Sequence, residues 1–273
     1  MLDLPDIPLS TSGRTATAVA REIASEAGNT LVERFHQVKS VTSKGRGNIV
    51  TDVDTEVEEK MLEAIRREFP DMGFLGEESK GVSPDRGYVW IVDPVDGTRN
   101  YASGVPFFSL VVGLALDGEV LVGVNYDPMR DEMFHAERGA GAFLNDEPIR
   151  VSERSSIEES VLGMDLSYND DGAVNGLQVI LSLWPGMQTS RTMGSSALGI
   201  SYAAAGRYDL YFHHQLEPWD QVAGLLLIEE AGGIITDRTG RRAGLVASNA
   251  TLHAEFMRKT EGLAWRTTTR TGE

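Results

Sequence analysis

The sequence contains no cysteine, and this absence removes several kinds of chemistry at once. Without a thiol, the chain can form no disulfide, no thiolate zinc site and no cysteine nucleophile. A long apolar segment is also missing: the longest run, 105–116, is interrupted by Pro106, Ser109 and Gly113, and is too short to span a bilayer. Residues 1–13 carry neither the basic nor the apolar region of a signal peptide, so we expect a soluble, cytoplasmic protein.

Basic residues are scarce relative to acidic ones. Lys and Arg total 25 against 41 Asp and Glu, which gives a formal net charge of −16. A surface this acidic repels nucleic acid and anionic lipid, so we expect neither nucleic acid nor a membrane as a partner. An anionic substrate would therefore need a local basic pocket or bound cations at the place where it docks.

Hydrophobic periodicity indicates a chain of mixed helices and strands. Hydrophobic residues make up 41% of the sequence, enough for a substantial core. The expected elements are a helix at 14–37, a polar loop at 40–48, a helix at 53–69, a strand at 88–92, a hairpin of 107–116 and 119–126 around Asp117-Gly118, strands at 132–137 and 149–151, a strand at 161–164 followed by a helical stretch, further helices near 197–205 and at 219–231, and a strand from Ile234. No repeat or linker divides them, so we predict one α+β domain over 1–273, with lobes of about 1–153 and about 154–273.

The apolar run 90–92 leads directly into two carboxylates, Asp93 and Asp96, on a turn that Pro94 and Gly97 make sharp. Such a turn can direct both carboxylates and a backbone carbonyl at one point, which is the oxygen-rich arrangement that Mg²⁺ prefers. The alternative is a plain turn, because Asp-Pro and Asp-Gly are common turn formers. Taken alone, the motif favours the plain turn.

Four further motifs also have ordinary structural explanations. Glu77 and Glu78 follow a short apolar run and could be solvated surface residues. Asp220 opens a strongly apolar helix, and Asp54 lies in the first turn of another, so both could be helix caps. The segment 194–196, Gly-Ser-Ser, precedes a helix and could hold a phosphate with free backbone N–H groups, although many such segments bind nothing.

Together, and in this order, the motifs resemble the inositol monophosphatase family. The stretches that carry the resemblance are NIVTDVD at 48–54, GEES at 76–79, WIVDPVDGTRNY at 90–101 and PWDQVAGLLLIEEAGG at 218–233. The resemblance extends over roughly 14–260. It implies a layered α-β-α-β-α sandwich of the inositol monophosphatase and fructose-1,6-bisphosphatase type. It also implies a magnesium-dependent, lithium-sensitive phosphatase of a small phosphorylated metabolite, and a homodimer, because the family is commonly dimeric.

The resemblance further implies a metal centre. Glu77, Asp93 and the carbonyl of Val95 correspond to the ligands of a first ion, and Asp93, Asp96 and Asp220 to those of a second. We expect two or three Mg²⁺ per site, with Mn²⁺ as a possible substitute. Two carboxylates about 4 Å apart repel by roughly 4 kcal/mol at an effective dielectric near 20, so converging acids need cations among them. The cations would also provide the positive charge that this acidic protein lacks, activate a water molecule and stabilise the leaving oxygen.

The remaining residues implied by the resemblance are catalytic and substrate-binding groups. Thr98 and Asp54 match the pair that holds and polarises the attacking water, and Glu77 completes the catalytic set. The expected phosphate and substrate contacts are Gly97, Thr98, Gly194, Ser195, His213 and Asp220.

The sequence departs from the family pattern at three positions, of which His213 bears on the substrate. Asn48 stands where many members have Asp, and Arg99 replaces a common Thr and adds a cation beside the site. His213 falls where inositol-selective members place a Glu, which weakens the case for strict inositol selectivity; the alternative is that His213 only lines the wall. Fructose-1,6-bisphosphatase, histidinol-phosphate phosphatase and nucleotide 3′-phosphatase activities on the same scaffold therefore stay open, as does a metal-binding regulatory protein without turnover.

Overall fold

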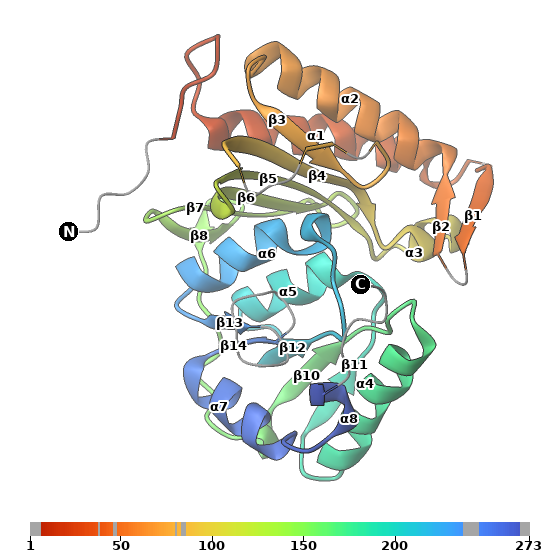
Figure 1. Cartoon of the computed structure of the whole chain (residues 1–273), viewed down its shortest axis with the longest axis vertical. Coiled ribbons are helices and arrows are strands. Elements are labelled where there is room, and N and C mark those ends of the chain that lie inside the picture. Colours follow the sequence, from red (N-terminus) through yellow and green to blue (C-terminus); the bar gives the residue numbers. More distant parts are fainter. Residues whose placement is uncertain are drawn as a thin grey trace.

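The computed structural model describes residues 7–37, 39–45, 48–79, 81–82, 86–236 and 246–267. Their elements stack as five layers in the order helices, sheet, helices, sheet, helices (Figure 1). This arrangement confirms the predicted α-β-α-β-α sandwich.

Helices α1 (Ala16–Phe35) and α2 (Asp52–Glu68) form the first layer. Both begin at a threonine cap, since the side chain of Thr15 accepts from the Ala18 N–H and that of Thr51 from the Val53 N–H. Each helix turns its apolar stripe onto the same face of the larger sheet, so the first hydrophobic core lies between them and that face.

The larger sheet has seven strands in the order β3-β4-β5-β6-β7-β8-β9, with β3 and β4 parallel and the other neighbours antiparallel. The strands are β3 (Gly73–Gly76), β4 (Tyr88–Asp96), β5 (Ser109–Leu116), β6 (Glu119–Asp127), β7 (Glu132–Glu137), β8 (Gly141–Leu144) and β9 (Glu147–Pro148). Asp117 and Gly118 connect β5 to β6 with φ angles of 49° and 83°. These positive angles are those of a two-residue hairpin turn, so the predicted hairpin is confirmed.

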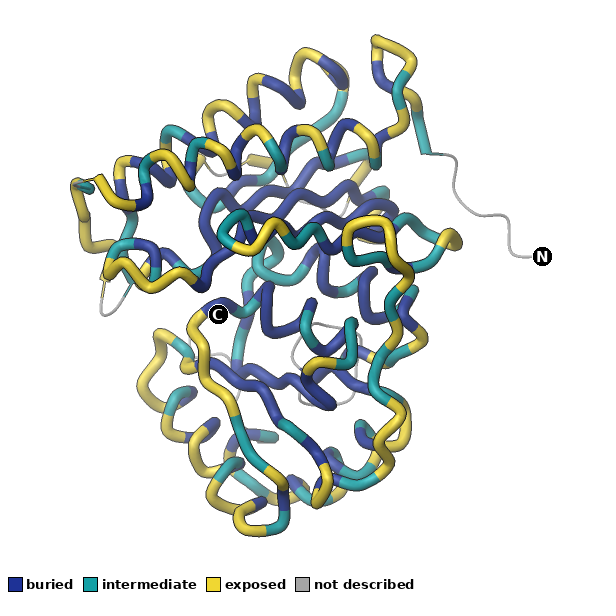
Figure 2. The backbone as a smooth tube through the Cα atoms, turned by 180° about the vertical axis from the view of Figure 1, so that it is seen from behind, coloured by how far each residue is buried: buried dark blue, intermediate teal, exposed yellow. Residues whose placement is uncertain are grey.

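Two helices, α5 (Ser196–Ala204) and α6 (Pro218–Glu230), form the middle layer. Helix α6 approaches the larger sheet closely because glycine occupies the contact points on β5 and β6. A Cβ atom at Gly113 would lie 2.4 Å from the side chain of Val222, and one at Gly123 would lie 2.8 Å from the Cα of Ala223. Figure 2 shows the result as a continuous buried zone through the sheets and the middle helices.

The smaller sheet and the outer helices complete the stack. The sheet has the order β11-β10-β12-β14-β13, in which β11, β10 and β12 are parallel. Its strands are β10 (Val161–Met164), β11 (Thr189–Arg191), β12 (Leu210–Phe212), β13 (Ile234–Thr236) and β14 (Val246–Ser248). The remaining helices are α3 (Thr98–Ser103), η1 (Ile157–Glu159), α4 (Asp170–Leu183), α7 (Ala250–Lys259) and α8 (Ala264–Thr267), and α4, α7 and α8 cover the outer face (Figure 1).

Two predictions about local structure were wrong. The expected loop at 40–48 contains strand β1 (Val41–Gly45) and the first residue of β2 (Asn48–Thr51), and these two strands pair antiparallel. All of β1 is exposed, so it carries none of the apolar alternation that would have revealed it. The strand expected at 149–151 is instead β9, and β8 was not predicted.

Candidate active site

Strand β4 brings the first two acids to the end of the larger sheet. The strand continues through Asp96 instead of turning after Asp93, and its pairing with β5 shifts register between these two residues. Gly97, with a φ of 96°, then redirects the chain into α3. Asp96 binds the start of α5, because it accepts from the Ser196 hydroxyl at 2.9 Å, from the Ala197 N–H at 3.0 Å and from the Ser195 hydroxyl.

Asp220 joins this pair from the first turn of α6. Oxygen atoms of Asp93, Asp96 and Asp220 all lie within 4.8 Å of one another. Asp93 and Asp96 are buried, and Asp220 is partly exposed. Burial, followed by the charges of Glu77, Asp96 and Asp220, raises the pKa of Asp93 well above its ordinary range. The structure therefore places three predicted metal ligands in one group.

Glu77 follows β3 beside this group. Because β3 pairs parallel with β4, with Gly76 opposite Val92, Glu77 leaves the sheet next to Asp93. Burial raises the pKa of Glu77 to about 7, against the lowering effect of the nearby Lys44 charge. The Lys44 Nζ lies 3.5 Å from Glu77 Oε1 and also pairs with Glu78.

Thr98 and Asp54 are in contact, as the resemblance implied. The Thr98 hydroxyl lies 3.2 Å from Asp54 Oδ1 and 3.0 Å from the carbonyl oxygen of Val95. The other Asp54 oxygen accepts from the Thr51 N–H at 3.0 Å, so Asp54 also caps α2. Burial raises the pKa of Asp54 to about 6, although the hydrogen bonds from Thr51 lower it.

The segment that precedes α5 lies against the turn at Gly97. A Cβ atom on Gly97 would lie 3.1 Å from the carbonyl oxygen of Gly194, so glycine at position 97 allows this segment to approach the turn closely. The Gly194 N–H, a candidate phosphate donor, points instead at Asp165 Oδ1, 2.6 Å away. The Ser195 hydroxyl is likewise directed at Asp96.

Asp165 is a buried acid beside the site that the sequence motifs did not include. It follows β10 and accepts from the N–H groups of Met193 at 2.9 Å and Gly194, and from the Tyr211 hydroxyl at 3.1 Å. Burial raises its pKa to about 7. Its position directly after the apolar run 161–164, like that of Asp93 after 90–92, was the signal that could have found it.

His213 leaves the smaller sheet at the same edge as Asp165. Strands β10 and β12 are parallel, with Met164 opposite Phe212, so the residues that follow them are neighbours. The His213 Nδ1 accepts from the Gln215 N–H at 3.2 Å, which assigns the ring proton to Nε2. Burial lowers the pKa of His213 to about 4, so the ring is neutral near pH 7 and presents a single N–H donor.

The donor set fits a hard divalent cation such as magnesium. Asp93, Asp96 and Asp220 each offer a carboxylate oxygen, and hard cations such as Mg²⁺ prefer oxygen ligands of this kind. Burial and mutual repulsion both disfavour their ionised forms, and a bound cation would reverse both effects.

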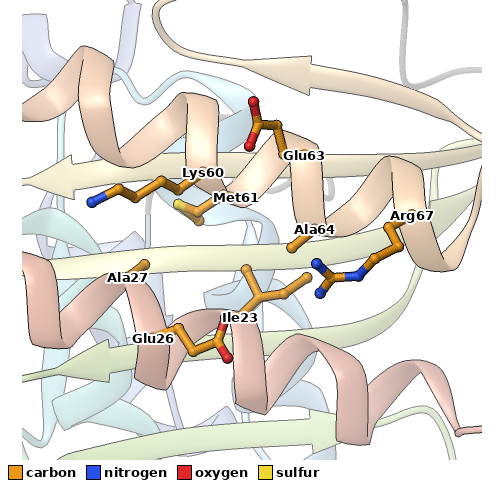
Figure 3. Close-up of a pocket in the computed structure, with 8 residues that line it drawn as sticks. All are labelled: Ile23, Glu26, Ala27, Lys60, Met61, Glu63, Ala64 and Arg67. Carbon is orange, nitrogen blue, oxygen red and sulfur yellow. The ribbon is translucent and has the colours of Figure 1, made fainter.

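A separate groove lies on the outer surface between α1 and α2 (Figure 3). Ile23, Ala27 and Met61 line it together with charged side chains of both signs, among them Lys60 and Glu63. Mixed charge on an outer helix face is typical of solvated surface, so we place the candidate site at the acid group instead.

Known proteins match this chain over most of its length. The model of the inositol monophosphatase family matches residues 13–268. The fructose-1,6-bisphosphatase/inositol-1-monophosphatase of Thermotoga maritima is 38% identical over 237 residues, which cover 85% of this chain and 90% of that protein. The Nus factor SuhB of Xylella fastidiosa is 35% identical over 233 residues, 84% of each chain.

A solved structure shares the whole architecture. The extragenic suppressor protein suhB of Bartonella henselae superposes with a TM-score of 0.85 at 34% identity, covering 90% of this chain and 98% of that one. Within the described part of the chain, no helix has both the length and the apolar character required to cross a bilayer.

Proposed function

The chain belongs to the inositol monophosphatase family, and from this membership we propose that it hydrolyses the phosphate monoester of a small polyol, sugar or related metabolite with the help of Mg²⁺. The observation that carries the proposal is the group formed by Asp93, Asp96 and Asp220, whose oxygens lie within 4.8 Å of one another. These residues come from a strand and a helix far apart in the sequence. A structural role alone does not require three buried or partly buried acids to converge.

We propose that Glu77, Asp93, Asp96, Asp220 and the carbonyl of Val95 hold two or three Mg²⁺, for which Mn²⁺ can substitute. When bound, such ions lower the pKa of a water molecule and stabilise charge on the leaving oxygen. The chain's own part is to keep the ligands in place: Ser195, Ser196 and the Ala197 N–H orient Asp96. Ser195 therefore acts on the site through its hydrogen bond to Asp96, and Gly194 lies against the turn at Gly97.

Thr98 and Asp54 would together accept a proton from the attacking water. Asp54 Oδ1 accepts from the Thr98 hydroxyl, and Oδ2 is held by Thr51, so the carboxylate cannot rotate freely. With its proton directed at Asp54, the Thr98 oxygen offers its lone pairs to a water proton. As the water proton moves to the Thr98 oxygen, the Thr98 hydroxyl proton would move to Asp54 Oδ1. A carboxyl whose pKa is about 6 can accept it near neutral pH.

The side chains of His213 and Arg99 affect which substrate the site prefers. The neutral His213 presents one N–H donor, whereas a Glu could accept hydrogen bonds from two vicinal hydroxyls of a polyol. Arg99 follows Thr98, and its guanidinium carbon lies 4.6 Å from the ring centroid of Tyr168, a residue of the opposite lobe. A donor and a cation favour a substrate with a second anionic group, so a sugar bisphosphate is the second candidate beside inositol 1-phosphate.

A substrate panel with magnesium tests these proposals. Inositol 1-phosphate, fructose 1,6-bisphosphate, histidinol phosphate and a nucleotide 3′-phosphate should be compared with and without chelator, and lithium should inhibit. We expect turnover that requires Mg²⁺, with inositol 1-phosphate a mediocre substrate that His213→Glu improves relative to the bisphosphate. Hydrolysis undiminished by chelator would contradict the metal mechanism. Metal binding without turnover of any member would favour a metal-binding regulatory protein, and one relative is named Nus factor SuhB and not a phosphatase.

We also propose a homodimer through helix α4. Val174, Leu177, Leu181 and Trp184 are all exposed, and their spacing of three, four and three residues forms one stripe on the helix. Two copies of a chain with a net charge of −16 repel each other over most of their surfaces, and this uncharged stripe is where they can approach. The same charge argues against nucleic acid or an anionic membrane as the partner.

A further inference from the structure

A buried glutamate on α2, outside every motif described above, holds the turn that carries Glu77. Glu58 is 2% exposed, and its two carboxylate oxygens accept backbone hydrogen bonds from consecutive residues. Oε2 accepts from the Glu78 N–H at 2.9 Å, and Oε1 accepts from the Ser79 N–H at 2.8 Å. Both oxygens are thus engaged with the backbone, so Glu58 fixes the turn and does not face the acid group as a ligand.

Glu58 and Asp54 are four residues apart on α2 and therefore lie on the same face of the helix. Asp54 contacts Thr98 at the end of β4, and Glu58 contacts the turn after β3. One rigid helix face thus touches the site at two points, and it sets the position of Glu77 relative to the Thr98–Asp54 pair.

Gly76 shows how tightly this contact is built. A Cβ atom on Gly76 would lie 2.6 Å from the Glu58 Cδ and 2.6 Å from its Oε2. Any larger residue at 76 would displace the carboxylate from the two N–H groups. Because Gly76 lies opposite Val92, the displaced turn is the one that places Glu77 next to Asp93.

We propose that Glu58 is a positioning residue for metal binding, which it supports by holding the turn at 77–79 so that Glu77 faces Asp93. This rests on the proposed role of Glu77 as a metal ligand. Residues that orient metal ligands through hydrogen bonds typically change metal affinity by about 10- to 100-fold when they are replaced.

The test compares Glu58→Gln with Glu59→Gln, an equal change of charge at the exposed neighbouring position of the same helix. The new amide side chain of Glu58→Gln would retain one acceptor oxygen, but its NH₂ group would face a backbone N–H that needs an acceptor. Free Mn²⁺ is measured by electron paramagnetic resonance in the absence of substrate. We expect Glu58→Gln to raise the Mn²⁺ dissociation constant about 10- to 100-fold, and Glu59→Gln to leave it unchanged.

Gly76→Ala provides a second route to the same displacement. It should weaken Mn²⁺ binding in the same way, and its effect should be less than additive with that of Glu58→Gln, because both variants disturb one contact. Excess Mg²⁺ should restore the turnover of either variant. It should not restore the turnover of Asp54→Asn, whose defect lies in proton transfer.

Unchanged Mn²⁺ affinity in Glu58→Gln or in Gly76→Ala, with only a lower unfolding temperature, would reduce Glu58 to a fold-stabilising residue and overturn the proposal. A wild-type protein that binds no Mn²⁺ would overturn the metal mechanism as well. If the wild-type protein bound Mn²⁺ normally but showed no phosphatase activity, the proposed function would be wrong. The role of Glu58 in metal binding would still be decided by the Mn²⁺ dissociation constants of the variants.

Discussion

Replacing Asp220 by Asn should stabilise the metal-free protein while it abolishes turnover. Burial, followed by the charge of Asp96, raises the pKa of Asp220 well above its ordinary range. The Asp220 Oδ2 accepts from the Glu217 N–H at 2.8 Å, and an amide oxygen can accept the same bond. At a pH where Asp220 is ionised, the change therefore removes one charge from the acid group, and it keeps the helix cap.

The distances set the size of the effect. Two unit charges at 4.8 Å, the upper limit of the oxygen separations in this group, repel by roughly 3.5 kcal/mol at an effective dielectric of 20. Partial protonation of the wild-type group relieves some of this repulsion, so we expect a net gain of about 2 kcal/mol at pH 8. For a chain of this size, that gain corresponds to a rise of roughly 4–8 °C in the unfolding temperature.

Thermal unfolding in the presence of chelator measures the stability of the metal-free protein, and thermal unfolding in excess Mg²⁺ measures the stabilisation that the metal adds. Mg²⁺ should raise the unfolding temperature of the wild type, and it should do so much less for Asp220→Asn. Asp71→Asn makes the same chemical change at an exposed position and should alter neither value. A lower unfolding temperature of Asp220→Asn in chelator would refute the repulsion argument.

Three further predictions concern proton transfer by Asp54, the buried imidazole of His213 and the proposed dimer contact on α4. Asp54→Asn should lower kcat about 10²- to 10⁴-fold with little change in KM; steady-state kinetics that show a raised KM and an unchanged kcat would make Asp54 a binding or capping residue. His213 stays neutral in the folded protein down to about pH 4, whereas the unfolded chain takes up its proton near pH 6.5. The free energy of unfolding should therefore fall by up to about 3 kcal/mol relative to His213→Gln as the pH drops from 6.5 to 4. Urea denaturation of the two proteins at pH 7.5 and 4.5 tests this, and a difference in unfolding free energy that is the same at both pH values would contradict it. Leu181→Glu should convert a dimer to a monomer in light scattering, because a charge would be buried in the α4 contact.

The sequence predicted the acid group because its motifs carry both local and family information. Asp54 and Asp220 each have a capping explanation and a site explanation, and the structure shows that the two are compatible. One oxygen of Asp54 caps α2 while the other meets Thr98, and Asp220 caps α6 while it joins Asp93 and Asp96. Local propensity and the observed geometry agree at these positions, which is why motif reading could predict that these residues lie together.

The residues that sequence reading missed act through partners distant along the chain. Glu58 has the sequence context of an ordinary helical glutamate, and only the packing of α2 against the turn after β3 gives it a role. Asp165 accepts from Gly194 and Tyr211, which belong to separate elements. The β1–β2 hairpin was missed for another reason: β1 is exposed along its whole length, so it has no apolar alternation.

The assembly of the acid group from β4 and α6 has a consequence for synthesis on the ribosome. Chains emerge at about 5–20 residues per second, and N-terminal segments can begin to fold before later ones appear. A nascent chain that ends at β9 already contains Asp93 and Asp96, but it lacks Asp220 and the α5 residues that bind Asp96. One face of its larger sheet also lacks α5 and α6, which cover it in the finished protein. The N-terminal segment therefore keeps an uncovered apolar face until α6, which ends at Glu230, has emerged from the ribosome. Transiently exposed apolar surface of this kind makes a nascent chain prone to aggregation.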